Sequence, residues 1–342
     1  MAAPLATAFA AAGVITLFSA WRWLTVWFKK LDQDCEFRTS VLGLETPFSV
    51  QKVAAPSILS DPAKLISFVI PAYNEALRLP ATLDETLGYL QRRRDRQGPG
   101  FTYEIIIVDD GSSDDTARVA GEYVKQAGLD AVRLLRLPAN RGKGYAVRTG
   151  MMICRGQLIL MMDADGATRV SDVEKLEAAL ETVAVKGAGE VPQQARQAPS
   201  RIVVRNEGLG MAVGSRSHLE NEALAKRSWY RNFLMRGFHL LVLSVAGGAI
   251  RDTQCGFKLL TRRTACTLAG NQRLQRWCFD VELIYVAQKL GIPIAEVPVN
   301  WTEIPGSKIK VTSIIHMAWE LAAILIGYSW LGLWRIHLEA GS

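Results

Sequence analysis

Two aspartates, Asp163 and Asp165, follow an apolar run at residues 157–162 and stand one residue apart, with Gly166 directly after them. Carboxylates this close raise each other's pKa unless a cation or hydrogen-bond donors offset the charge. A divalent hard cation bound by one or two carboxylates and by substrate phosphate oxygens is the simplest solution, and Mg²⁺ or Mn²⁺ suits such ligands. The spacing therefore predicts a metal–phosphate site, although an aspartate pair after a strand is also common without metal.

Two earlier apolar runs end in similar side chains. The first is followed by Asn74 and Glu75, and the second by Asp109 and Asp110. In open parallel α/β sheets ligands bind at the carboxyl ends of the strands, so these groups should converge on one crevice. For Asp109 and Asp110 an ordinary turn and helix cap remains an alternative.

A glycine-rich stretch, NRGKGYAVRTG at residues 140–150, precedes the run that leads to Asp163. It contains Lys143 but lacks the Walker spacing, so a phosphate-binding loop and a surface loop are both open. In order, at the ends of successive strands, these motifs are more specific together than any one is alone.

The elements that must position these groups alternate between strand-like and helix-like runs from residue 64 onward. This alternation predicts an α/β, Rossmann-like domain with a mainly parallel sheet. We expect helices at residues 79–94 and 115–127, and another after the capping box that Ser171 and Glu174 form. A polar linker is expected at 31–63, and a surface insertion at about 184–207, which is rich in Gly, Pro, Gln and Arg.

Both termini are apolar. Residues 5–20 carry no charge, and Arg22, Lys29 and Lys30 all follow them, which predicts a transmembrane signal-anchor at residues 1–30 with the bulk of the chain in the cytosol. A cleaved secretory signal is the alternative, but the charged segment that precedes such signals is missing. The C-terminal segment, residues 313–342, predicts an apolar helix that is interfacial or membrane-associated.

Charge and cysteines narrow the class further. The 40 Lys and Arg exceed the 33 Asp and Glu, giving a net charge of +7, which favours an anionic partner without choosing among phosphates, lipid headgroups and nucleic acid. The five cysteines are scattered and nowhere spaced C-x-x-C, which indicates a reducing compartment and no structural zinc. A basic stretch suits anionic lipid headgroups, although a buried helix with a solvated end fits as well; it comprises Lys226, Arg227, Arg231, Arg236 and Arg251.

Eight motifs in order carry a resemblance to a known family: VIPAYNE, IIIVDDGSSDDT, NRGKGYAV, MMDADGAT, VGSR, DTQCGFK, WCFDVEL and GSK. Over residues 64–312 the chain resembles the family 2 inverting glycosyltransferases of GT-A fold, and more closely the dolichyl-phosphate β-glucosyltransferases. The resemblance implies a GT-A domain that uses UDP-glucose, dolichyl phosphate and Mg²⁺ or Mn²⁺. It also implies contact with membrane lipid but not nucleic acid, and a place on the endoplasmic reticulum membrane with the catalytic domain facing the cytosol.

The same resemblance implies a role for individual residues. Asp165, together with Asp163, would ligate the metal. Arg216 and Lys308 would hold the acceptor phosphate and the leaving diphosphate, and Asp280, with Glu282, would lie on the acceptor side. The residues that would bind the nucleotide sugar are Pro71, Tyr73, Glu75, Asp109, Asp110, Lys143, Asp163 and Ala164.

Two departures concern the sugar. Relatives that transfer mannose carry a glutamine where this chain has Ala167, and an arginine where it has Thr302. Both departures weaken the interpretation of the chain as a mannosyltransferase, and they leave open which groups complete the set of metal ligands. The acceptor, a phosphate monoester with a second pKa of ~6, is largely dianionic near neutral pH and needs no general base. We therefore expect Asp280 to orient cationic groups rather than to accept a proton.

Other functions compete. A polyprenyl-phosphate mannosyltransferase or another family 2 enzyme shares most motifs. QRLQRW at residues 272–277 is one residue too long for the signature of processive polysaccharide synthases, and DADGAT places its threonine one position late for an aspartyl-phosphate phosphatase. A membrane-tethered scaffold that only binds nucleotide sugar is the non-enzymatic alternative.

Overall fold

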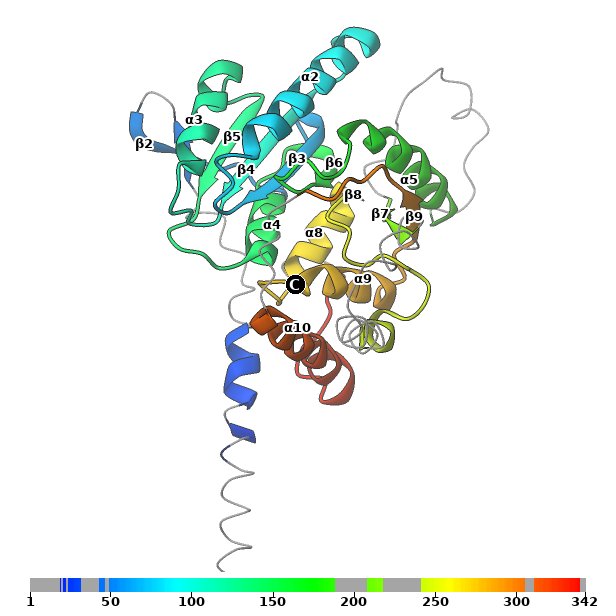
Figure 1. Ribbon diagram of the computed structural model, residues 1–342. Helices are drawn as coiled ribbons and strands as arrows, with labels where there is room; N and C mark the ends of the chain where they lie inside the picture. The colour runs from blue at the N-terminus through cyan, green and yellow to red at the C-terminus, as the bar shows by residue number, and fades with distance from the viewer. Residues whose placement is uncertain are drawn as a thin grey trace, which may run out of the picture.

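The computed structural model describes residues 19, 21–22, 24–31, 43–46, 49–187, 208–217, 241–304 and 311–338. Its centre is a seven-stranded sheet of order β5-β4-β3-β6-β8-β7-β9 (Figure 1). The strands are β3 (Lys64–Ala72), β4 (Tyr103–Asp109), β5 (Val132–Arg136), β6 (Gly156–Met161), β7 (Met211–Ser215), β8 (Lys258–Thr261) and β9 (Ile294–Pro298). β3, β4, β5 and β6 run parallel, whereas β8 is antiparallel to both of its neighbours. The predicted α/β architecture with a mainly parallel sheet is confirmed.

Helices cover both faces of the sheet, which explains why its central strands are apolar without interruption. Along β3, Phe68 and Ile70 join the core under one set of helices, while Val69 joins the core under the other. The first set is α2 (Leu79–Gln97), α3 (Thr116–Ala127) and α5 (Val173–Gly187). The second set is α4 (Lys143–Met152), α8 (Arg262–Asn271), α9 (Phe279–Lys289) and α10 (Val311–Ile324), followed by a π-helical segment, Leu325–Trp330.

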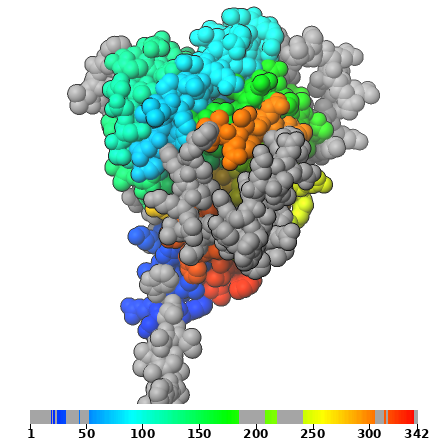
Figure 2. Space-filling model, viewed as in Figure 1, coloured from blue at the N-terminus to red at the C-terminus, as the bar shows by residue number. Residues whose placement is uncertain are grey.

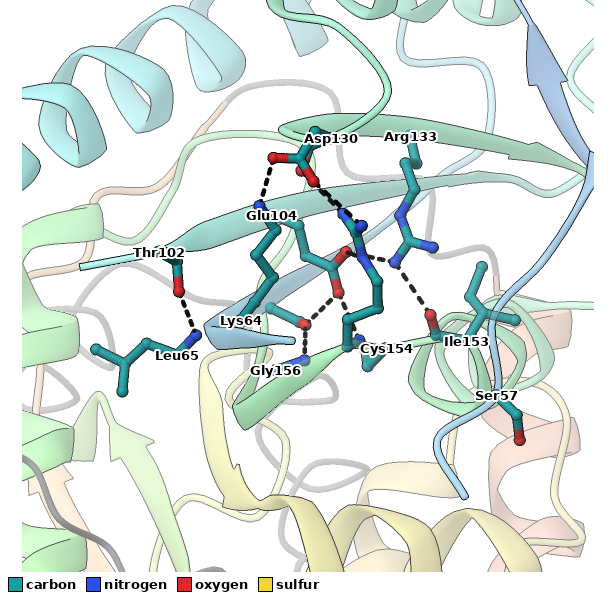
Figure 3. A network of polar contacts seen from close by, with 12 residues as sticks. Ser57, Lys64, Leu65, Thr102, Glu104, Asp130, Arg133, Ile153, Cys154 and Gly156 are labelled. Carbon is teal, nitrogen blue, oxygen red and sulfur yellow. Dashed lines mark hydrogen bonds and ion pairs between the residues drawn. The ribbon is translucent and has the colours of Figure 1, made fainter. Parts of the chain in front are cut away.

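The amino ends of the parallel strands are tied together by a network of charges (Figure 3). Glu104 of β4 is fully buried and accepts hydrogen bonds from Ser67 on β3, from Arg133 on β5 at 2.5 Å, and from Arg155 just before β6. Asp130 extends the network at the surface, where its carboxylate lies 2.6 Å from Lys64 Nζ. The network fixes the spacing of four strands at the edge opposite their carboxyl ends.

The first and last described segments pack together beneath the sheet, the blue and red segments at the base of Figures 1 and 2. The Phe28 ring, from the helical residues 24–31, is buried with its centroid 4.8 Å from that of Trp334. The ring centroid of Trp27 lies 5.6 Å from that of Trp319 in α10. Within the described residues, no helix combines the length and the apolar character that crossing a bilayer requires.

Several predicted segments lie wholly or partly outside the described residues: residues 1–18, 20 and 23 of the expected anchor, and residues 188–207 of the expected insertion. α5 extends to Gly187, so the first residues of that expected insertion are helical. The stretch expected to be a linker contains an antiparallel hairpin of β1 (Gly43–Thr46) and β2 (Ser49–Ala54).

Candidate active site

The carboxyl ends of β3 and β4 are joined by their loops. Asn74, which has a positive φ of 54°, donates its backbone N–H to Ser112 Oγ and accepts a hydrogen bond from Ser113 N on its side chain. Asn and Asp tolerate this left-handed conformation better than other residues with a side chain. The two loops therefore form one continuous rim at the edge where the predicted site residues emerge.

Asp109 and Asp110 leave the end of β4 buried. Asp110 accepts the backbone N–H groups of Arg141 and Gly142, each at 2.8 Å, and so shapes the start of the glycine-rich loop. Burial raises the pKa of Asp110 above its ordinary value, although these hydrogen bonds oppose the shift. Among the described residues, the buried Asp109 Oδ2 has no hydrogen-bond donor, although Arg136 Nε forms an ion pair with it at 3.6 Å.

The glycine-rich loop passes closely under the loop before α9. Gly142 has a φ of +107°, and a Cβ there would lie 2.6 Å from Gln275 O, so glycine is required twice over. Lys143 begins α4 directly afterwards, and its Nζ lies 2.6 Å from Asp163 Oδ1. Burial alone would raise the pKa of Asp163, but the Lys143 ammonium holds it below its ordinary value.

The loop after β6 presents Asp165 beside this ion pair. Asp165 Oδ1 accepts a hydrogen bond from Ala167 N at 3.0 Å, and burial followed by the charge of Asp163 raises the pKa of Asp165. Within the described residues no group of three or more His, Cys, Asp or Glu is placed to hold a metal. Asp163 and Asp165 are two carboxylates, and a Mg²⁺- or Mn²⁺-type ion commonly takes one or two carboxylates together with ligands from substrate and water.

A second ion pair lies on the other side of Asp163. Lys258, the first residue of β8, is fully buried and donates to Asp280 Oδ1 and to Cys255 O. The Lys258 charge also acts on Asp163, and a Cβ at Gly256 would collide with the Asp163 carboxylate. Asp280, in the first turn of α9, is therefore paired with a cation, the Lys258 ammonium group.

Glu282, expected beside Asp280, is placed differently. Its fully buried carboxylate accepts the backbone N–H groups of Arg273 and Leu274 and the hydroxyl of Tyr328. Residues two apart on a helix point away from each other, which explains the separation of Glu282 from Asp280. Glu282 thus stabilises the loop before α9 from within the core.

That loop connects the glycine-rich loop to α10. Its carbonyls accept the N–H groups of Gly144 and Tyr145, at 3.2 and 2.9 Å. On its other side, Glu320 of α10 accepts the N–H groups of Trp277 and Cys278, at 3.1 and 2.9 Å. The start of α4, which carries Lys143, is thereby linked to the C-terminal helix through one shared segment.

Arg216 follows β7 and is fixed by a partner that sequence reasoning missed. Its Nε and Nη2 donate to the two oxygens of Asp252, at 2.7 and 2.8 Å, and its guanidinium lies 5.4 Å from the Trp301 ring centroid. Burial lowers the pKa of Arg216, but the hydrogen bonds to Asp252 and the charge of Asp252 outweigh this effect, so the pKa lies above its ordinary value. Asp252 stands in the DTQCGFK motif, which was its only signal in the sequence.

The other residues predicted to bind the nucleotide sugar differ in their exposure and in their partners. Pro71 lies in β3, and Tyr73 follows that strand with its side chain exposed. Ala164 is buried, and its carbonyl accepts a hydrogen bond from Thr82 Oγ1 of α2. Glu75 is paired with Arg78, a residue that the sequence had not singled out.

Lys308 and the basic residues from Lys226 to Arg236 lie outside the described residues. The positions of the two departures are neighbours, because Ala167 O accepts the N–H of Thr302 at 2.8 Å. They lie beside Asp165 and add neither a charge nor a further carboxylate to it.

Comparisons with known proteins identify the family of this chain. The model of the glycosyl transferase family 2 matches residues 67–216. The chain is 49% identical to dolichyl-phosphate beta-glucosyltransferase of Mus musculus over 287 residues, which cover 84% of this chain and 82% of the relative. The Homo sapiens enzyme of that name is 47% identical over 288 residues, with the same shares of each chain. The Saccharomyces cerevisiae enzyme is 36% identical over 280 residues, 80% of this chain and 78% of its own.

Among solved structures, glucosyl-3-phosphoglycerate synthase from Mycobacterium tuberculosis in complex with uridine-diphosphate is 17% identical, with a TM-score of 0.46 and coverage of 78% of this chain and 80% of that one. The sequence relatives are far closer and extend over most of the chain. The resemblance inferred from the motifs is confirmed, and the chain belongs to the family 2 glycosyltransferases and, within them, to the dolichyl-phosphate β-glucosyltransferases.

Proposed function

We propose that this chain transfers glucose from UDP-glucose to dolichyl phosphate with inversion, giving dolichyl β-D-glucosyl phosphate for N-linked glycan assembly. The observation that carries the proposal is the Lys143–Asp163 ion pair beside Asp165, at the carboxyl edge of β6. The pair and Asp165 together supply an ammonium group and two carboxylates, one with a raised pKa, at the sheet edge where a metal-bound diphosphate would lie.

The nucleotide would lie along the rim formed by the loops after β3 and β4. Asp109 Oδ2, which is ion-paired with Arg136 at 3.6 Å but has no hydrogen-bond donor among the described residues, would accept a hydrogen bond from the uracil imide or the ribose. Pro71 and the exposed Tyr73 would line the pocket at the end of β3. Asp110 would act indirectly, by holding the backbone of the glycine-rich loop.

The metal would be held by Asp165 with Asp163. When bound, it supplies positive charge against the charge that develops on the leaving diphosphate. Lys143 adds an ammonium group at the N-terminus of α4, where the helix dipole also favours anions. The backbone of Ala164 would lie close to the sugar. Its carbonyl accepts a hydrogen bond from Thr82, which holds this backbone in place.

The acceptor phosphate would attack the anomeric carbon from the face opposite the diphosphate. A dianionic phosphate carries its own nucleophilic charge, so Asp280 can remain paired with Lys258 throughout. Arg216, held by Asp252, and Lys308 would hold the two anions in line and suppress their repulsion. Catalysis would thus consist of positioning and charge neutralisation.

The membrane face would be the base of the molecule, where the first and last described segments meet (Figure 2). Trp330 is 74% exposed there, and Trp21 and Trp319 also reach solvent, which suits an interfacial aromatic belt. We assign residues 1–30 to an anchor, 31–63 to a linker, 64–312 to the catalytic domain and 313–342 to a membrane-associated tail. The location would be the endoplasmic reticulum membrane, with the catalytic domain facing the cytosol.

The test uses the purified full chain with UDP-[¹⁴C]glucose, dolichyl phosphate and Mn²⁺. We expect a chloroform-soluble, acid-labile product, and no preference for GDP-mannose. Intact binding of UDP-glucose without transfer would favour a scaffold instead. Asp165→Ala should abolish transfer at saturating Mn²⁺ in a folded protein, while Asp115→Ala, at an exposed pair with Arg118, should leave it unchanged. Near-normal turnover of Asp165→Ala would contradict the metal role.

A further inference from the structure

Arg78 is fixed in one orientation at the start of α2. Its Nε and Nη2 donate to the two carboxylate oxygens of Glu75, each at 2.6 Å. A planar guanidinium matched to a carboxylate in this way loses its rotational freedom. The Arg78 side chain nevertheless stays 24% exposed, so a ligand can reach it.

The first turns of α2 lie against the loop that carries Asp163 and Asp165. One helical turn after Arg78, Thr82 Oγ1 donates to Ala164 O at 2.9 Å, and a Cβ at Gly166 would lie 3.1 Å from Thr82 Oγ1. The hydrogen bonds that Arg78 donates to Glu75 raise the pKa of Arg78 most, and the charges of Asp165 and Asp163 raise it further. The guanidinium is therefore close to both carboxylates.

Arg78 also keeps unused donors. An arginine has five N–H groups, and Glu75 accepts two of those of Arg78. In the part of the chain that the structure describes, no acceptor is found for the other three. Lys143, by contrast, is engaged with Asp163, and Arg216 with Asp252. Arg78 is thus a pre-oriented cation with free N–H groups beside the proposed metal ligands.

We propose that Arg78, oriented by Glu75, donates its remaining N–H groups to the diphosphate of the nucleotide sugar. The inference rests on the proposed function for the identity of that diphosphate. Arg78 then contacts the substrate directly, and Glu75 is a positioning residue rather than part of the uridine pocket. Ala167 and Thr302, which lie beside Asp165, offer no charge for this task.

The experiment measures the affinity of the full chain for UDP and for uridine by calorimetry, with and without Mn²⁺. Arg78→Gln should weaken UDP binding about 10- to 100-fold, as expected for lost hydrogen bonds to a charged group, and change uridine binding less than about 2-fold. Glu75→Gln should weaken UDP binding less, since Arg78 keeps its charge but loses its orientation. Arg118→Gln, which removes an exposed arginine from an acidic partner at the same i,i+3 spacing, should change neither affinity.

Unchanged UDP affinity in Arg78→Gln, or an equal loss for UDP and uridine, would overturn the inference. If Arg78→Gln does not fold, Arg78→Lys decides, because a lysine keeps the charge without the fork and should weaken UDP alone. If the wild-type chain binds a different nucleoside diphosphate, the proposed donor is wrong. The same comparison with that diphosphate and its nucleoside then still tests Arg78.

Discussion

Replacing Lys258 by methionine should leave the buried Asp280 side chain without the cation that it pairs with. The side chains of the pair are 0% and 5% exposed, so water cannot take the place of the ammonium group. Removing one partner of such a buried pair costs about 3–5 kcal/mol, whereas replacing both partners by apolar residues of similar volume is often close to neutral. Lys258→Met should therefore cost about 3–5 kcal/mol, and Lys258→Met/Asp280→Leu should recover most of it.

The assay is urea unfolding of the full chain in detergent, followed by tryptophan fluorescence. A matched control is Arg96→Met, which removes an arginine from the exposed pair with Glu174, where the side chains are 60% and 44% exposed. Because exposed pairs contribute little, that variant should lose less than about 1 kcal/mol. A Lys258→Met variant as stable as the control, or a double variant less stable than Lys258→Met, would refute the account of this buried pair.

Two further predictions concern the site and its scaffold. Gly256→Ala should lower transfer about 100-fold, because its Cβ displaces the Asp163 carboxylate. The control Gly121→Ala, in open space within α3, should leave transfer unchanged and raise the free energy of unfolding by about 0.5–1 kcal/mol. Equal transfer activities of the two variants would contradict this. The hydrogen bond from Lys64 lowers the pKa of Asp130 below its unfolded value of 3.8, so its contribution is present above pH 3.8 and is lost as the pH falls through the lowered pKa. Urea titrations should show wild type more stable than Asp130→Asn by at most about 1 kcal/mol at pH 6, since the Asp130 side chain is 79% exposed, with the curves converging below pH 3.8; a gap independent of pH would exclude this mechanism.

The carboxyl edge of the sheet was predictable because strand ends leave a local signal. Apolar runs that stop at Asp109 and Asp163 reveal both the strand and the point where it meets solvent. The glycines around Lys143 likewise mark a close backbone approach, which the structure places against Gln275. The strand ends and the glycines are local in the sequence, although the partner of the close approach, Gln275, is not.

Features made by distant residues were not predictable in the same way. Lys258 begins a strand of only four residues, and a lysine there suggests a surface until Asp280 is known to face it. Arg78 and Glu75 lie three residues apart, yet their importance comes from the loop around Asp165, which only the folded chain brings near. The placement of Glu282 was within reach, because helical geometry separates it from Asp280.

The segment shared by the glycine-rich loop and α10 has a consequence for how the enzyme is made. On the ribosome, the strands that end at Asp109 and Asp163 emerge well before Glu320. Until α10 follows them, the N–H groups of Trp277 and Cys278 lack the carboxylate that accepts them in the finished fold. The loop before α9, which positions the start of α4 and Lys143, is therefore secured only after α10 has emerged, and a nascent chain that already holds every donor-site motif is not yet an assembled catalyst.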